Sequence, residues 1–190
     1  MKINFNEIKT KSNLLSLIRL LTAIPFWFLL DDFNSSQTRI IIFALCIFAA
    51  LTDILDGFLA RKYNEVTELG KIIDPFADKI VIASIIIKLF SIGKVDLFYF
   101  ILIISRDILI FIGGIIVSSK IGKVLPSNIL GKITVINISL VILLILFNLS
   151  EDNVVFNLLY YLSITLIIIS IIAYTYRAIE FIKKKDYGTI

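Results

Sequence analysis

Long apolar runs separated by short polar stretches make up nearly all of the 190 residues. Six such runs span residues 14–30, 40–60, 74–92, 97–117, 133–149 and 154–176. A helix needs about 20 apolar residues to cross a bilayer, within a range of about 17–25. The pattern predicts an all-α polytopic membrane protein with six transmembrane helices. We expect a single domain over 1–190 that begins with a short interfacial segment at residues 1–12.

The composition supports a membrane protein and restricts its chemistry. Hydrophobic residues are 58% of the chain, and the mean hydropathy is +0.97, which is outside the range of soluble globular domains. The chain has no histidine, which excludes Ser-His-Asp triads, Cys-His dyads and imidazole metal ligands. The single cysteine, Cys46, lies in an apolar run, and we expect a small buried hydrophobe there. Catalysis would therefore depend on carboxylates, Lys, Arg or a metal.

Basic residues are unevenly distributed among the polar segments, which orients the predicted helices. The two termini and the second and fourth connections hold thirteen lysines and arginines, whereas the other connections hold only Arg39 and Lys94. Basic residues accumulate on the cytoplasmic side of a membrane. We therefore expect both termini and the second and fourth connections in the cytoplasm, as an even number of spans requires.

Four aspartates lie where the second and third predicted spans meet their cytoplasmic connection. Asp53 and Asp56 are three residues apart and Asp74 and Asp78 are four apart, so each pair shares a helix face. Pro75, directly after Asp74, is typical of a helix start near Asp74. Carboxylates at the edge of a membrane are costly unless they bind a partner, and Mg²⁺ prefers oxygen ligands. The pattern predicts a site for two divalent cations, which can stabilise a displacement at phosphorus.

Small residues and an arginine accompany the aspartates. Gly57 and Ala60 leave room for a ligand close to the helix backbone. Arg61 can bind a diphosphate through two guanidinium nitrogens. Gly70, in the predicted connection, allows a tight turn or a close contact with a base.

Two other interpretations compete with a cation-dependent enzyme. In the first, the aspartates pair with Arg19, Arg106 or Lys79 and only hold helices together. We prefer the cation site because four carboxylates outnumber the buried bases. In the second, the chain is a small ion-coupled transporter, since acids inside a membrane also mark ion pathways. Against it, the chain shows no internal repeat, and its acids cluster at one mouth of the membrane.

The polar positions resemble a family signature. The run Asp53-x2-Asp56-Gly57-x2-Ala60-Arg61-x8-Gly70-x3-Asp74-x3-Asp78 matches all eight fixed positions of the CDP-alcohol phosphotransferase signature. The segment Ser12-Asn13-Leu14-Leu15-Ser16-x2-Arg19 is similar to the N-terminal pattern of that family, with Ser in place of its Pro and its Thr. The resemblance covers nearly the whole chain.

The resemblance implies transfer of a phosphatidyl or similar group from a CDP-linked donor to an alcohol, with release of CMP. Two Mg²⁺ or Mn²⁺ ions would be bound by Asp53, Asp56, Asp74 and Asp78. Asp78 would also be the base that takes the proton of the acceptor hydroxyl. The CDP pocket would be formed by Asp53, Gly57, Ala60, Arg61 and Gly70. We expect a homodimer in a bacterial inner membrane whose partners are CDP-diacylglycerol, an alcohol and membrane lipid, with no nucleic acid.

Fewer residues indicate the acceptor alcohol. Residues 74–79 resemble a segment of phosphatidylglycerophosphate synthases and of eukaryotic-type cardiolipin synthases, and Arg106 and Lys132 match positions that hold acceptor phosphate. The glycerophosphate enzymes commonly carry a second arginine eight residues after the first, where this chain has Gly114. We expect glycerol 3-phosphate, because compact chains of this bacterial kind most often use it. The alternatives are phosphatidylglycerol, as in cardiolipin synthases, and another alcohol such as inositol phosphate.

Arg106 also has a direct physical interpretation. It is the tenth of 21 residues in its predicted span, where a charge is costly unless it faces a cavity or a partner. Consecutive side chains of a helix point about 100° apart, so we expect a poor pair with Asp107. The position therefore predicts that Arg106 binds an anion. Lys88 lies near the outer end of its span, and we expect its ammonium to extend to the interface.

Overall fold

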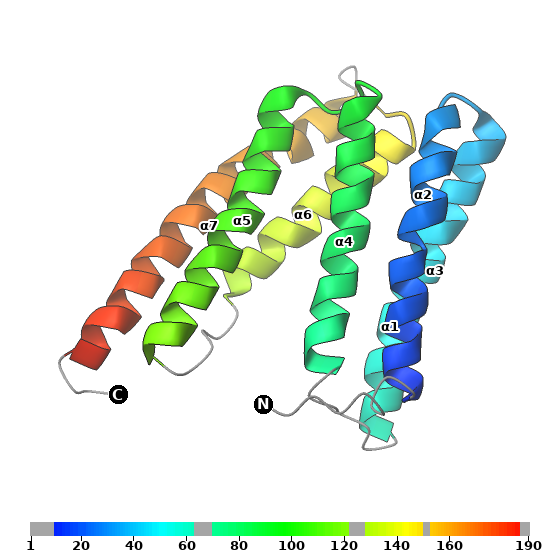
Figure 1. Ribbon diagram of the computed structural model, residues 1–190. Coiled ribbons are helices and arrows are strands. Elements are labelled where there is room, and N and C mark those ends of the chain that lie inside the picture. Colours follow the sequence, from blue (N-terminus) through cyan, green and yellow to red (C-terminus); the bar gives the residue numbers. More distant parts are fainter. Residues whose placement is uncertain (1–9, 63–69, 122–127, 150–152, 187–190) are drawn as a thin grey trace. The chain divides into compact units, whose positions relative to one another are not determined.

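The computed structural model in Figure 1 describes residues 10–62, 70–121, 128–149 and 153–186. Within these ranges it describes only the backbone at 11–12, 60–61, 70–76, 118–121 and 183–186. The described elements are all helices, as predicted, and they form two compact units, Met1–Val95 and Asp96–Ile190. That the whole of 1–190 acts as one domain stays a prediction.

The first unit is built around the N-terminal helices. It consists of α1 (Lys11–Leu21), α2 (Ala23–Leu29), the 3₁₀ helix η2 (Leu30–Asp32), α3 (Ser36–Lys62) and α4 (Gly70–Ser91). Helix α1 packs against both α3 and α4, and α2 packs against α4. The break between α1 and α2 follows from Pro25, which has no N–H and whose ring conflicts with the carbonyl of Leu21. Thr22 bridges the break, because its N–H is shared between the carbonyls of Ile18 and Arg19 at 3.2 and 2.9 Å.

A half-buried ion pair joins α4 to η2. Lys88 is only 7% exposed, its Nζ lies 2.6 Å from Asp31 Oδ1, and it stands 4.9 Å from the centre of the Trp27 ring. Lys88 thus meets an exposed carboxylate and an aromatic face, and its extension to the interface stays a prediction. Gly93 ends the helix in the left-handed region with φ 72°, and Lys94 N–H then donates to the carbonyl of Leu89 at 2.8 Å.

The second unit consists of α5 (Leu97–Ile121), α6 (Ile129–Leu146) and α7 (Val154–Asp186), and α7 packs against both of the others. Side chains just before each helix satisfy its first N–H groups. Asp96 accepts from Tyr99 N–H at 2.9 Å, and Asn153 accepts from Val155 N–H at 2.9 Å. The second oxygen of Asp96 accepts from the Tyr160 hydroxyl at 2.5 Å, so one carboxylate caps α5 and holds α7.

Within the part of the chain that the structure describes, five helical stretches are long and apolar enough to cross a membrane, so the chain is an integral membrane protein. They are Asn13–Asp32, Ser36–Leu59, Leu97–Val117, Ile129–Leu146 and Val154–Ile182. The other predicted span, 74–92, coincides with α4, whose side chains are described only from Ala77 onward, and it stays a prediction. Residues 1–9 of the predicted interfacial segment lie outside the described residues, and Lys11 already belongs to α1.

Candidate cation and active site

Helix α1 carries a polar face although it lies at the start of a membrane span. Asn13, Ser16 and Arg19 are spaced three residues apart, so they lie on adjoining turns of one side of the helix. All three are buried, with exposed fractions of 1%, 0% and 2%. Because α1 packs against α3 and α4, this face is turned to the interior of the first unit, where buried polar groups require partners.

The partners are three of the four predicted aspartates. Arg19 Nη1 lies 3.0 Å from Asp53 Oδ1 and also donates to Asp78 Oδ1, while Arg19 Nη2 donates to Asp56 Oδ2. Asp53 and Asp56 come from α3 and Asp78 from α4. The structure thus brings together carboxylates from two helices around a single guanidinium of a third.

The three carboxylates differ in their exposure. The Asp56 side chain is 5% exposed and also accepts from the Ser16 hydroxyl at 3.2 Å. The side chains of Asp53 and Asp78 are 55% and 42% exposed. The cluster therefore has a closed inner end at Asp56 and an open outer end at Asp53 and Asp78, where a ligand can enter the unit.

The pairing with Arg19 is the one that the purely structural interpretation predicted, yet three carboxylates share one guanidinium in these contacts. The oxygen donors suit a hard cation, and the guanidinium shows that a positive charge is accommodated between them.

No group of three or more potential ligands is close enough to hold a metal among the residues that the structure describes. Asp74, the fourth predicted ligand, belongs to the part of α4 whose side chains are not described. The two-ion site therefore stays a proposal.

The start of α4 differs from the prediction. The helix begins at Gly70 and not at Asp74, so Gly70 is the first helical residue and not part of a turn. Pro75 is the sixth residue of this helix, which is beyond the first turn where proline is normally accommodated. Gly57 follows Asp56 on α3, and Ala60 and Arg61 continue the same helix. The side chains of Ala60 and Arg61 lie outside those described, and the assignment of these residues to a CDP pocket stays a prediction.

Arg106 forms a second polar cluster, in the second unit. Its side chain is 8% exposed, Nη1 donates to Asp107 Oδ1 at 2.6 Å, and Nη2 donates to the carbonyl of Gly131 at 3.3 Å. The expectation of a poor pair with Asp107 is wrong, because the long arginine side chain bends back to its neighbour. Arg106 Nε is buried and has no hydrogen-bond partner among the described residues, so one donor is left for a ligand.

Lys132 lies next to the residue that Arg106 contacts. Gly131 and Lys132 are in the first turn of α6, and Lys132 is exposed. The hydrogen bond from Arg106 to Gly131 thus brings the middle of α5 to the helix start that carries the second predicted acceptor residue.

Tyr174 is a residue that the sequence did not single out. A Cβ atom added at Gly114 would lie 3.1 Å from its hydroxyl oxygen, and one added at Gly113 would lie 3.0 Å from its Cε1 atom. The ring from α7 therefore fills the space of a side chain at position 114. The adjacent Gly113 and Gly114 were the sequence feature that could have indicated it, since neighbouring glycines allow the close approach of a bulky side chain.

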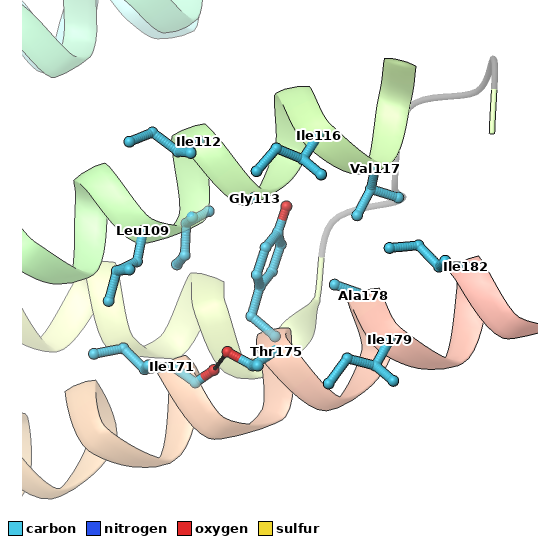
Figure 2. Close-up of a pocket in the computed structure, with 12 residues that line it drawn as sticks. Leu109, Ile112, Gly113, Ile116, Val117, Ile171, Thr175, Ala178, Ile179 and Ile182 are labelled. Atoms are coloured by element: carbon cyan, nitrogen blue, oxygen red, sulfur yellow. Dashed lines mark hydrogen bonds between the residues drawn. The ribbon is translucent and has the colours of Figure 1, made fainter. Parts of the chain in front are cut away.

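An apolar hollow of about 260 Å³ lies between α5 and α7 in this region, and Figure 2 shows residues that line it. Ile112 and Ile116 of α5 and Ile179 of α7 are among its lining residues, and Thr175 adds a hydroxyl that bonds back to the carbonyl of Ile171 at 2.8 Å. Apart from Tyr174 and Thr175 the lining is apolar, so the hollow presents an uncharged surface beside Gly113.

Comparisons with known proteins give one family. A family model described as CDP-alcohol phosphatidyltransferase matches residues 9–175. A protein of Aquifex aeolicus (strain VF5) named CDP-diacylglycerol–glycerol-3-phosphate 3-phosphatidyltransferase is 36% identical over 179 residues, which are 91% of this chain and 98% of that protein.

Other relatives match over shorter stretches. A protein of the same name from Rickettsia bellii (strain RML369-C) is 40% identical over 98 residues, which are 52% of this chain and 54% of the relative. A rat protein named cardiolipin synthase (CMP-forming) is 38% identical over 104 residues, which are 53% of this chain and 32% of the relative. Both alignments therefore leave about half of this chain unmatched.

Asp56→Asn is expected to destabilise the protein more than Asp53→Asn. At residue 56 the change removes a charge-assisted bond in a buried position, at a cost of about 1–3 kcal/mol. Residue 53 is more than half exposed, and an exposed ion pair contributes about 0–1 kcal/mol. Thermal unfolding of the two variants in the same detergent measures the difference, and equal losses would contradict the inner and outer ends assigned to the cluster.

Proposed function

The chain belongs to the CDP-alcohol phosphatidyltransferase family, and we propose that it transfers a phosphatidyl group from CDP-diacylglycerol to glycerol 3-phosphate, with release of CMP. The observation that carries the choice of acceptor is the similarity over 91% of the chain to an Aquifex aeolicus protein whose name states this reaction. The product would be phosphatidylglycerophosphate.

The proposed cofactor is a pair of Mg²⁺ or Mn²⁺ ions held by Asp53, Asp56, Asp74 and Asp78. The support is the convergence of three of these carboxylates on the guanidinium of Arg19 and the all-oxygen chemistry of the donors. When bound, the ions would supply electrostatic stabilisation of the phosphate oxygens and of the leaving group.

Asp78 is the proposed general base. Its half-exposed carboxylate lies at the open end of the cluster, where it can take the proton of the acceptor hydroxyl. The freed oxygen attacks the phosphorus that carries the diacylglycerol, the new O–P bond forms, and the bond from this phosphorus to the oxygen of CMP breaks. CMP leaves with the electron pair. Asp53, Gly57, Ala60, Arg61 and Gly70 are proposed to hold the CDP part of the donor.

Arg106 and Lys132 are proposed to bind the phosphate of the acceptor. Arg106 has a buried Nε without a partner among the described residues, which is costly unless a ligand accepts from it. The glycerophosphate enzymes commonly carry a second arginine where this chain has Gly114, and Tyr174 fills the space that a side chain would take there. This difference favours a second candidate acceptor, phosphatidylglycerol. The similarity to the rat protein named cardiolipin synthase is consistent with that candidate.

The proposed location is a bacterial inner membrane, with both termini and the active site facing the cytoplasm. The support for this orientation is the concentration of thirteen basic residues in the termini and the second and fourth connections. Relatives from Aquifex and Rickettsia support a bacterial source. By the family resemblance, the functional unit is a homodimer.

The product of the purified protein tests the reaction. Incubation with CDP-diacylglycerol, Mn²⁺ and one alcohol at a time is expected to give CMP and phosphatidylglycerophosphate with glycerol 3-phosphate, and excess EDTA is expected to abolish turnover. Mass spectrometry identifies the lipid. Turnover in excess EDTA would contradict the cation site. A product from phosphatidylglycerol alone would replace the proposed acceptor, and absence of CMP with every alcohol would contradict the reaction.

Asp78→Asn is expected to lower kcat by about 10²–10⁴-fold, because an amide cannot accept the proton of the acceptor. The KM for CDP-diacylglycerol should change much less, since three aspartates remain. Asp32→Asn is the matched control: Asp32 is exposed on η2 and accepts from the Thr38 hydroxyl at 2.9 Å, which an amide oxygen can also do. A normal kcat in Asp78→Asn, measured by steady-state kinetics beside this control, would reassign the base.

Arg106→Ala is expected to raise the KM for glycerol 3-phosphate by about 10- to 150-fold, the equivalent of one charge-assisted hydrogen bond of about 1.5–3 kcal/mol. The KM for the CDP donor should remain close to that of the unaltered protein. Arg39→Ala is the control, because the Arg39 side chain bonds, among the described residues, to Asn34 and Ser36 in its own segment. Equal losses for donor and acceptor would make Arg106 a structural residue.

A further inference from the structure

Arg19 occupies the centre of the proposed cation site. Its side chain is 3% exposed, and both of its terminal nitrogens are directed at carboxylate oxygens. Nη1 is shared by Asp53 and Asp78, at the open end of the cluster, and Nη2 is bound to Asp56 at the closed end. The guanidinium is therefore the positive charge around which the carboxylates converge in this structure.

The surrounding residues hold Arg19 in this position. Its Nε lies 3.5 Å from Thr52 Oγ1, and the Thr52 hydroxyl donates in turn to the carbonyl of Ala49 at 2.8 Å. The Thr22 hydroxyl donates to the backbone carbonyl of Arg19 at 2.5 Å. Ser16, one turn earlier on α1, donates to the same carboxylate oxygen as Nη2. Both the backbone and the guanidinium plane are thus fixed by partners on α1 and α3.

We propose that Arg19 is an internal counter-ion that competes with the divalent cation for these carboxylates. Without a positive charge between them, three neighbouring carboxylates repel one another, and Arg19 removes this repulsion in the protein without metal. An oxygen that accepts from the guanidinium cannot bind a cation equally well, and the guanidinium and the cation carry charges of the same sign. Arg19 therefore has to give up contacts when a cation is bound.

The geometry points to the contacts that are given up. Asp53 and Asp78 share a single nitrogen and are about half exposed, so a cation reaches them from the open end. Asp56 is buried and has Ser16 as a second donor. We expect Arg19 Nη1 to release Asp53 and Asp78 while Nη2 stays on the inner side. This inference rests on the proposed cation site but not on the identity of the acceptor alcohol.

Mn²⁺ binding to detergent-purified protein without substrates tests the competition. Arg19→Gln removes the charge, and Arg19→Lys keeps it but loses the planar fork that contacts several carboxylates. Lys88→Gln is the matched control, because it removes another buried cation from the same unit, one that is paired with Asp31. Free Mn²⁺ is measured by electron paramagnetic resonance, and unfolding midpoints are measured with and without Mn²⁺.

Arg19→Gln is expected to bind Mn²⁺ about 5- to 150-fold more tightly than the unaltered protein, a factor of the size usual for coupling between two binding events on one protein. Its unfolding midpoint should fall without Mn²⁺ and rise more than that of the unaltered protein when Mn²⁺ is added. Arg19→Lys should show a smaller gain in affinity. Lys88→Gln should lower the midpoint and leave the affinity unchanged. Adding Asp53→Asn to Arg19→Gln should remove the gain.

Unchanged or weaker Mn²⁺ binding in Arg19→Gln would overturn the competition. If Arg19→Gln does not fold, the same result in Arg19→Lys would overturn it. A gain that survives Asp53→Asn would mean that the ion binds elsewhere, which also overturns it. Absence of Mn²⁺ binding in every protein, the unaltered one included, would overturn the cation site together with this inference, whereas the lipid product tests the acceptor separately.

Discussion

The contact of one guanidinium with three carboxylates determines how the first unit is organised. Arg19 is on α1, Asp53 and Asp56 are on α3, and Asp78 is on α4, so a single side chain fixes three helices relative to one another. A charge in a membrane span is tolerated only with partners of this kind. The same contact collects the oxygen ligands of the proposed site at one place. In this unit, packing and chemistry thus depend on the same few atoms.

In the second unit, two separate charged side chains bind their partners in different ways. Asp96 connects α5 to α7 at one end, through a backbone N–H of α5 and the hydroxyl of Tyr160. Arg106, in the middle of α5, bonds to the neighbouring Asp107 and to a carbonyl at the start of α6. Asp96 has both of its oxygens occupied, whereas Arg106 retains a buried donor without a partner among the described residues. The charge of Asp96 is therefore structural, whereas that of Arg106 is suited to binding an anion.

The sequence predicted the helical membrane architecture and the family, because both depend on local patterns. Apolar runs of sufficient length define spans, and the spacing from Asp53 to Asp78 is specific to the signature that the family model confirms. The pairing of each aspartate could not be predicted in this way. Arg19 is 37 residues from Asp56 along the chain, and only the packing of α1 against α3 makes them partners.

The local errors have local causes. Asp74 and Pro75 suggested a helix start, but α4 begins at Gly70, four residues before Asp74. Arg106 and Asp107 were expected to diverge, but a long side chain is not confined to the direction of its Cα–Cβ bond. In the second case the direction set by the backbone was outweighed by a contact that the side chain could make.

The packing of Tyr174 on Gly113 and Gly114 restricts how this chain can diverge. Any side chain introduced at position 114 meets the tyrosine hydroxyl at its first carbon. A side chain there therefore requires the end of the Tyr174 side chain to move by a few tenths of an ångström, whereas a smaller residue in place of Tyr174 leaves an unfilled space beside two glycines. The two positions are thus coupled, and a substitution at one changes the effect of a substitution at the other.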